Sequence, residues 1–327
     1  MKKLVALILA VMLIVAATAA LAEEKVPKIA YVPKVIGQPW WDYVQKNVEE
    51  WGAENGFEVI YKGPADLDAA AQVQIMTDLV NQGVDILCFS AFDPNACEEV
   101  CKQALEKGII VIGTESAGME NITYDVEAHD DAGLGAFLMD QLAKQMGEEG
   151  EYITMVGSMT QESQNNWADG AVARQKEAYP NMTLVEDARV SSESDQQVAF
   201  NRTKELKEKY PNLKGILGTS SFDGPGAAKA IADMGLTGQM FAISVALPSE
   251  VGDLLDNGVM ECVGLWDPGL AAKAQLNAAM ILYNGGTIEN GTDLGIAEYS
   301  DVKVEGKVII GKGDVAITAE NWESFGF

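Results

Sequence analysis

The sequence predicts an α/β protein built from two similar lobes, each a doubly wound parallel sheet with helices on both faces. The chain has 327 residues, which is long enough for two ordinary domains. Short apolar strands alternate with helices along it, and such βα units are typical of parallel sheets. The same order of elements then begins again at residue 152.

Glycines mark the ends of the predicted helices in the first half. Gly56, Gly83 and Gly108 each follow a helical stretch, and glycine favours the left-handed conformation at helix C-termini. The strands are 28–32, 57–61, 84–89, 109–112 and 122–124, and the helices are 40–55, 68–82, 95–107 and 130–146.

The second half repeats the alternation. Pro268 stands in the first turn of the last helix, where proline fits best because its missing N–H is not needed there. The strands are 152–156, 184–190, 215–218, 241–244, 259–266 and, in the tail, 307–310, and the helices are 163–179, 195–209, 225–234, 249–257 and 267–284.

Two pairs of segments carry the internal repeat. The stretches "IAYVPKVIGQPWW" and "ITMVGSMTQESQNNW" both run from a strand through a polar loop to a tryptophan and a helix. Further along, Phe92 and Asp93 correspond to Phe222 and Asp223 between a strand and a helix. Doubly wound sheets bind ligands at the carboxyl ends of their strands. Two such lobes facing each other would place both sets of loops on one cleft.

Charge and the first residues restrict the partners and the compartment. A formal net charge of −26 disfavours nucleic acid and anionic membrane surfaces, and we interpret it as a solubility feature. Lys2 and Lys3, an apolar stretch and the small residues around Leu21 form a secretory signal peptide over residues 1–22, with cleavage predicted after Ala22. The predicted destination is the periplasm, and an uncleaved membrane anchor is the alternative.

The sequence predicts no metal site and no cofactor. Cys97 and Cys101 lie one helical turn apart, too far for an undistorted disulfide, and Cys88 and Cys262 fall in apolar strands as core thiols. His129 is the one histidine in the chain, and no CxxC motif accompanies it. We expect that histidine to cap a helix or pack at the surface.

Enzyme signatures are nearly absent, so the sequence favours a binding protein over a catalyst. No GxSxG nucleophile elbow occurs, and the near-Walker stretch "GKVIIGKG" lacks its closing Ser or Thr. A secreted enzyme acting on sugars is the alternative, and it would need two carboxylates flanking the bond. Glu115 and Asp267 are the candidates for that pair.

Polar and aromatic side chains gather in the loops that follow the predicted strands of both halves. Carboxylates, amides and a lysine suit a polyhydroxylated ligand, because each ligand hydroxyl both donates and accepts hydrogen bonds. Aromatic rings suit the C–H face of a sugar. Taken singly, such residues are also ordinary loop residues or helix caps. The set comprises Lys34, Trp40, Trp41, Glu115, Gln161 to Asn165, Trp167, Thr219, Ser220, Ser221, Asp223, Trp266 and Asp267.

The chain resembles the periplasmic sugar-binding proteins of ABC importers, of the ribose and galactose type (type I). The motifs that carry the resemblance are "IAYVPKVIGQPWW", "QVQIMTDLVNQGVDILCFSA", "QNNW", "VGLWD" and "ENWESFGF". The resemblance implies two lobes joined by a three-strand hinge that closes on a ligand. The N-terminal lobe would comprise residues 26–126 and 268–298, and the C-terminal lobe residues 127–267 and 299–327.

The resemblance also implies site residues, and it is strongest toward the members that bind autoinducer-2 and rhamnose. The family's lysine, aromatic pair, glutamine and hinge aspartate correspond to Lys34, Trp40, Trp41, Gln164 and Asp267. Four positions depart from the autoinducer-2 pattern. Glu115 and Ser163 replace aspartates, and Thr219 and Ser221 replace a proline and an alanine.

These departures change which hydroxyls can be held, so we expect a small monosaccharide or sugar-like furanose, with an autoinducer-2 receptor as the alternative. The implied partners are this sugar or polyol and an ABC permease in the membrane, and contact with a chemoreceptor is compatible with the role. We expect a monomer that binds no nucleic acid. A ligand-sensing transcription factor of the same fold would need a basic helix-turn-helix, which the chain lacks.

The two adjacent tryptophans leave one question open. On a helical wheel, Trp40 shares a stripe with Val44, Val48 and Trp51, whereas Trp41 lies at the edge of that stripe. The wheel alone therefore predicts that Trp40 is a core residue. Because the helix begins beside the expected cleft, both rings could border the ligand, and which of them stacks on it stays open.

Overall fold

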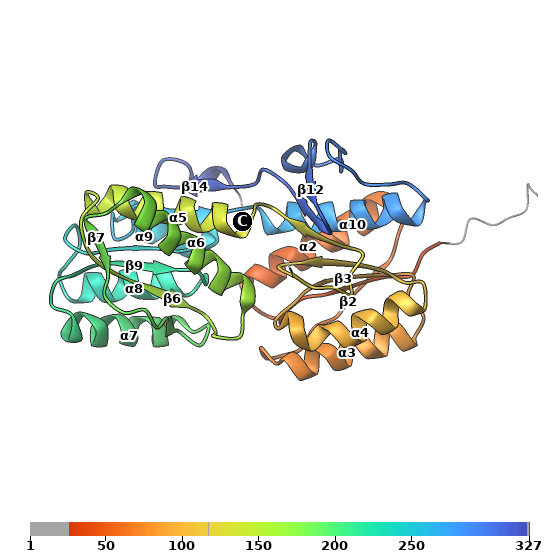
Figure 1. The fold of residues 1–327 in the computed structure, drawn as a ribbon, viewed down its shortest axis with the longest axis horizontal. Coiled ribbons are helices and arrows are strands. Elements are labelled where there is room, and N and C mark those ends of the chain that lie inside the picture. The colour runs from red at the N-terminus through yellow and green to blue at the C-terminus, as the bar shows by residue number, and fades with distance from the viewer. Residues whose placement is uncertain (1–25, 117, 326) are drawn as a thin grey trace, which may run out of the picture.

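The structure is a computed structural model that describes residues 26–116, 118–325 and 327. The predicted signal peptide and its cleavage site lie outside these residues. Two α/β lobes stand side by side, with α2, α3, α4 and α10 in the first lobe and α5 to α9 in the second (Figure 1). Within the described ranges, no helix is long and apolar enough to cross a membrane.

The first lobe is built on a seven-stranded sheet with the order β12-β13-β5-β4-β3-β1-β2, in which only the β12–β13 pair is antiparallel. Its strands are β1 (Ile29–Val32), β2 (Val59–Tyr61), β3 (Ile86–Ser90), β4 (Ile110–Thr114), β5 (Tyr124–Glu127), β12 (Lys303–Glu305) and β13 (Val308–Ile310). Its helices are α2 (Pro39–Asn55), α3 (Ala69–Asn81), α4 (Pro94–Glu106) and α10 (Pro268–Tyr283).

Helices cover both faces of this sheet, which explains why its central strands are apolar throughout rather than alternating. Along β1, Ala30 and Val32 pack in one core cluster with residues of α3 and α4, such as Met76 and Val100. The intervening residues face the opposite way, and Tyr31 packs in the other cluster with residues of α2 and α10. A strand buried on two faces needs apolar side chains at every position.

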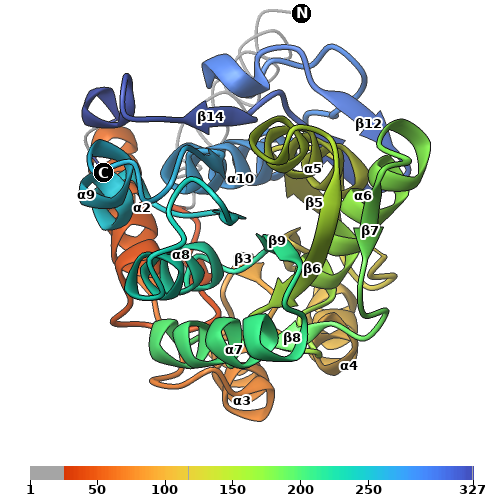
Figure 2. The same ribbon diagram turned by 90° about the vertical axis from the view of Figure 1, so that its left-hand side faces the viewer.

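The second lobe has a parallel sheet with the order β10-β9-β6-β7, and β8 also pairs with β6. Figure 2 shows α5 and α6 on one side of β6 and β9, with α7 and α8 on the other. The strands are β6 (Gly150–Val156), β7 (Met182–Leu184), β8 (Val190–Ser191), β9 (Leu213–Gly218) and β10 (Phe241–Ile243). The helices are α5 (Asp131–Met146), α6 (Glu162–Ala178), α7 (Gln196–Lys209), α8 (Asp223–Asp233) and α9 (Pro248–Asp256).

The chain crosses between the lobes three times. The first crossing follows β5, and the second lies between β11 (Val263–Leu265) and α10. The third lies between β13 and β14 (Val315–Ile317), and Figure 1 shows β12 over the first lobe and β14 over the second. Backbone hydrogen bonds from Gly311 to Glu127 and from Gly313 to Ala128 join the first and third crossings, and β14 pairs with β11.

The third crossing corrects one predicted boundary. Residues 299–327 were expected to belong to the C-terminal lobe as a block. Instead, β12 and β13 extend the sheet of the first lobe, so the chain leaves that lobe only after Ile310. Strands of three residues carry too little periodicity to reveal which sheet they join.

Two further strand predictions need correction, and two strands were missed. The strand expected at 184–190 is two short strands, β7 and β8, which pair with different parts of β6. The strand expected at 259–266 shrinks to β11, and β12 and β14 were not predicted at all. The predicted helices are confirmed, each within about two residues at its ends, because capping residues fix them. Asp68, Asp93 and Asp195 each accept a backbone N–H of the helix that follows.

Candidate functional site

A cleft lies between the lobes, and it encloses about 490 Å³ of space including its open mouth. We call it the interlobe cleft. The loops that form it follow β1, β2 and β4 in the first lobe and β6, β8, β9 and β10 in the second, so the carboxyl ends of strands from both sheets meet there. Its lining comprises Lys34, Gln38, Trp40, Trp41, Leu67, Glu115, Gln161, Gln164, Trp167, Ser194, Thr219, Ser220, Ser221, Phe222, Val245 and Trp266.

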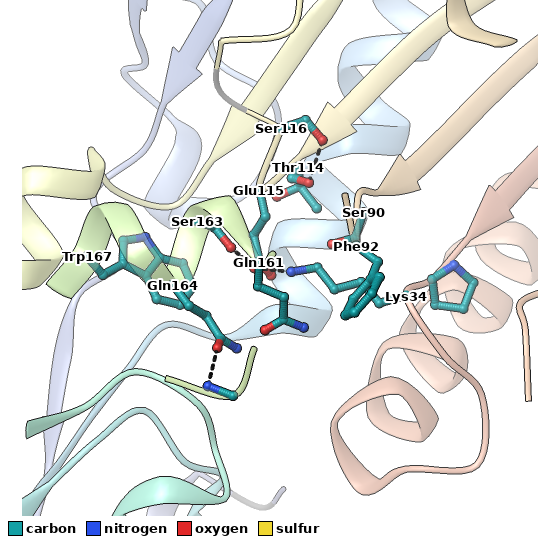
Figure 3. A network of polar contacts seen from close by, with 12 residues as sticks. Lys34, Ser90, Phe92, Thr114, Glu115, Ser116, Gln161, Ser163, Gln164 and Trp167 are labelled. Carbon is teal, nitrogen blue, oxygen red and sulfur yellow. Dashed lines mark hydrogen bonds and ion pairs between the residues drawn. The ribbon is translucent and has the colours of Figure 1, made fainter. Parts of the chain in front are cut away.

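The charged wall of the interlobe cleft belongs to the first lobe and is internally neutralised. Lys34 Nζ lies 2.7 Å from Glu115 Oε2, and their side chains are only 4% and 10% exposed. Ser163 Oγ, from the second lobe, donates to the same carboxylate oxygen at 2.8 Å (Figure 3). Desolvated charges are tolerated when they are paired and hydrogen-bonded, so this pair presents dipoles rather than a net charge to the cleft.

Glu115 holds an unusual backbone conformation. Its φ is +51°, in the left-handed region that residues other than glycine seldom adopt. The turn after β4 therefore aims this carboxylate back toward Lys34, and strained residues of this kind cluster at functional sites.

Four indoles form the aromatic part of the cleft. Trp40 meets Trp266 edge to face with ring centroids 5.2 Å apart, and Trp167 meets Trp266 in the same way at 5.4 Å. Trp167 Nε1 donates to Asp131 Oδ1 at 2.8 Å, which fixes that ring. Trp41 completes the set. Aromatic rings beside placed polar groups are typical of small-ligand sites.

The wheel prediction for the tryptophan pair is wrong. Trp41 is the buried ring, 7% exposed, and Trp40 is half-buried against Trp266. The reason is that Trp41 also reaches the buried stripe, because Val44 stands three residues after it and four after Trp40. Both spacings are compatible with one helix face.

The second lobe contributes neutral polar groups. Gln164 Oε1 accepts the Gly157 N–H at 2.8 Å, which ties the start of α6 to the end of β6 (Figure 3). Asp223 Oδ2 accepts the N–H groups of Thr219 and Ser220, so it shapes the turn after β9 from outside the cleft lining. Burial raises the pKa of Asp223 to about 6.

Two of the nine site residues that the family resemblance implies do not line the interlobe cleft. Ser163 touches it only through its bond to Glu115. Asp267 Oδ1 accepts the N–H groups of Gly269 and Leu270 and caps α10, while Oδ2 accepts from the Tyr43 hydroxyl at 3.2 Å. Burial raises the pKa of the Asp267 carboxyl. The other seven predicted residues, Lys34, Trp40, Trp41, Glu115, Gln164, Thr219 and Ser221, come together at the cleft.

The expectation that His129 packs at the surface is wrong. Its side chain is buried at the first crossing, with its ring centroid 4.8 Å from that of Trp266 and 5.8 Å from that of Trp167. Burial lowers its pKa to about 4, so it is neutral at ordinary pH. Nearby on β5, burial raises the pKa of Asp125 to about 7 and also raises that of Glu127.

The residues that the structure describes contain no cluster of three or more His, Cys, Asp or Glu side chains able to hold a metal ion. The four cysteines are buried free thiols, and burial raises the pKa of Cys262 to about 11 and that of Cys97 to about 12. Such thiols are core residues rather than reactive groups.

Sequence reasoning missed five residues of the cleft lining: Gln38, Leu67, Ser194, Phe222 and Val245. Two of them carried a usable signal. Gln38 directly precedes the Pro-Trp-Trp stretch, and Phe222 belongs to the Phe-Asp pair of the internal repeat. Nothing in the sequence marked the other three. Leu67 lies in the loop between β2 and α3 of the first lobe, and Ser194 and Val245 lie in loops of the second lobe.

Comparisons with known proteins agree with this architecture. A model of the periplasmic binding protein domain matches residues 29–287. The D-allose-binding periplasmic protein of Escherichia coli (strain K12) is 24% identical over 251 residues, which cover 73% of this chain and 79% of that protein.

Two solved structures share the fold over nearly the whole chain. LsrB from Clostridium saccharobutylicum in complex with AI-2 aligns with a TM-score of 0.81 and 21% identity, covering 92% of this chain and 100% of its own. An ABC transporter solute binding protein from Clostridium phytofermentas with bound L-rhamnose aligns with a TM-score of 0.82 and 21% identity, covering 92% and 98%.

Proposed function

This chain belongs to the periplasmic binding protein family, and from that premise we propose that it is the solute-binding component of an ABC importer for a neutral monosaccharide. The observation that carries the proposal is the interlobe cleft, where a neutralised Lys34–Glu115 pair, four indoles and amides from the second lobe face one space between the lobes. The sugar lies between the lobes, and the closed form is favoured because it makes contacts from both of them.

The charge arrangement supports a neutral ligand. The Lys34 ammonium already has its counter-ion in Glu115, so a ligand carboxylate or phosphate would meet an ion pair without net positive charge. Hydroxyl groups match the remaining donors and acceptors, because they both donate and accept. Sugar acids and sugar phosphates therefore fit less well than pentoses, hexoses and deoxyhexoses.

Binding rather than catalysis fits the two carboxylates. Glycoside hydrolysis needs an acid and a second carboxylate on either side of the bond. Glu115 is held by Lys34 and Ser163, and Asp267 is committed to capping α10. Capture outside the cytoplasm after removal of the signal peptide, delivery by a monomer to a permease, and contact with a chemoreceptor form part of the same proposal.

The test is titration calorimetry of the ligand-free mature chain. The panel contains D-ribose, D-allose, D-arabinose, L-rhamnose, xylitol and autoinducer-2, with D-gluconate and D-galacturonate as anionic counterparts. We expect at least one neutral compound to bind with a Kd in or below the micromolar range, and both acids to bind far more weakly. Binding of no panel member tighter than millimolar, or preferential binding of the acids, would refute the proposal.

A further inference from the structure

Gln161 occupies a position that is energetically unfavourable without a ligand. It lines the interlobe cleft and its side chain is only 3% exposed. Its Oε1 has no hydrogen-bond partner among the described residues, and it stands at the N-cap of α6 without a side-chain capping bond. A buried amide oxygen that has lost its water and found no donor destabilises the fold.

Gln164, one helical turn further along, provides the comparison. It lines the same cleft and is also buried, but its Oε1 accepts the Gly157 N–H at 2.8 Å. Figure 3 shows this bond as a dashed line, whereas the Gln161 amide is drawn without one. The oxygen of Gln164 therefore stabilises the fold, whereas the oxygen of Gln161 can accept a hydrogen bond from a ligand in the cleft.

We propose that Gln161 is a ligand-binding residue, whose Oε1 accepts a hydrogen bond from a hydroxyl of the bound sugar while Nε2 can donate to a neighbouring hydroxyl oxygen. This inference rests on the proposed function and adds a residue that the family resemblance did not supply. Glu115 and Gln161 come from different lobes, so a sugar that contacts both links the lobes. The buried oxygen then gains its missing donor on closure.

Three variants separate this role from a structural one. Gln161→Leu removes both amide atoms at similar volume, and Gln161→Glu keeps the shape but adds a negative charge to a cleft that already holds Glu115. Gln164→Leu is the matched control, because its amide has a partner within the chain. Calorimetry uses the tightest-binding neutral sugar of the panel above, and thermal unfolding is measured on ligand-free protein.

We expect Gln161→Leu to weaken sugar binding about tenfold or more, because a ligand hydroxyl loses its partner in a dry site. Its ligand-free unfolding midpoint should be equal to or above that of the wild type. Gln161→Glu should weaken binding too. Gln164→Leu should lower the ligand-free midpoint by several degrees, because Gly157 loses its acceptor.

Two results would overturn the inference. One is sugar affinity of Gln161→Leu within twofold of the wild type, and the other is a loss of ligand-free stability as large as that of Gln164→Leu. If the wild type bound none of the panel, the proposed function would fail instead. The unfolding comparison needs no ligand, so it still decides whether the Gln161 amide serves the fold.

Discussion

The two walls of the interlobe cleft use polar groups in opposite ways. The first lobe supplies full charges, Lys34 and Glu115, which are 2.7 Å apart and satisfy each other. The second lobe supplies neutral groups, and the buried oxygen of one of them, Gln161, has no partner among the described residues. The charges are therefore neutralised within the first wall, and discrimination among neutral ligands depends on the amide and indole side chains.

The largest expected effect comes from breaking the charged wall. Lys34→Met leaves Glu115 buried without its counter-ion, so we expect a loss of about 3–5 kcal/mol in the free energy of unfolding. Chemical denaturation measures this loss. The control is Lys46→Met, because Lys46 is 66% exposed and its ion pair with Glu50 spans 4.0 Å. Equal small losses in both variants would show that the charged wall is not a buried pair.

The two adjacent tryptophans of the first wall have different roles, one in the core and one at the cleft. Trp41 is buried in the core, so Trp41→Ala should lower the free energy of unfolding by about 3–5 kcal/mol. Trp40→Ala should cost less stability and weaken sugar binding more strongly, because that ring is half-buried beside Trp266 at the cleft. Chemical denaturation and calorimetry on both variants test this assignment. A larger stability loss in Trp40→Ala than in Trp41→Ala would support the helical-wheel prediction instead.

The buried acids of β5 extend this comparison, because among the described residues neither Asp125 nor Glu127 forms an ion pair of the kind that joins Lys34 to Glu115. Asp125 is fully buried, with the acidic side chains of Glu127 and Asp131 nearby, and burial raises its pKa to about 7 from 3.8. Between these values the folded state binds more protons than the unfolded state, so this group contributes less stability as the pH rises.

Asp125→Asn removes that contribution. Relative to the wild type, the variant should gain roughly 2 kcal/mol in the free energy of unfolding between pH 5 and pH 7. His129 acts with the opposite sign, because its pKa is lowered to about 4 and its contribution grows from there to about pH 6.5. Denaturant titrations at each pH measure the difference, and a constant gap between variant and wild type would contradict it.

Substitution of Asp267 tests whether this residue binds the ligand, as the family resemblance implies. As the cap of α10 it should, when changed to alanine, lower the free energy of unfolding by about 1 kcal/mol. We expect sugar affinity to fall less than tenfold, since Asp267 does not line the interlobe cleft. Complete loss of binding in a folded Asp267→Ala protein would return this residue to the ligand site.

The smallest expected effect concerns the hydrogen bond that joins the two walls. Ser163→Ala removes the hydroxyl that reaches Glu115 across the cleft, so the closed form loses about 1 kcal/mol and sugar affinity falls about fivefold. Ser158→Ala, whose hydroxyl bonds only within an exposed loop, should leave the affinity unchanged. Equal affinities in the two variants would remove Ser163 from the account.

Much of the fold and most of the site could be predicted because they depend on regular spacing. The alternation of strands and helices, the internal repeat and the loops after strands are all visible in the order of residues. Seven of the nine predicted site residues line the cleft for that reason. The hairpin of β12 and β13 could not be assigned, because its short strands join a sheet whose other members lie more than 170 residues earlier along the chain.

The remaining errors concern residues whose chemistry allows two roles. An aspartate such as Asp267 can cap a helix or hold a hydroxyl, and only the positions of the nearby N–H groups decide. Trp40 and Trp41 both satisfy helical spacing. Gln161 and Gln164 have identical side chains, and what separates them is which one reaches the Gly157 N–H. These roles depend on which groups lie nearby in three dimensions, and the spacing of residues along the sequence does not predict that.

Native mass spectrometry of the protein isolated from its producing cells tests the central claim most directly. We expect one neutral molecule per chain, with the mass of a pentose, hexose, deoxyhexose or similar polyol, and its absence from the Gln161→Leu variant isolated in parallel. A bound acid or phosphate ester would contradict the neutralised charge of the first wall. Retention of the same sugar at full occupancy by the variant would contradict the ligand-binding role of Gln161 in the second wall.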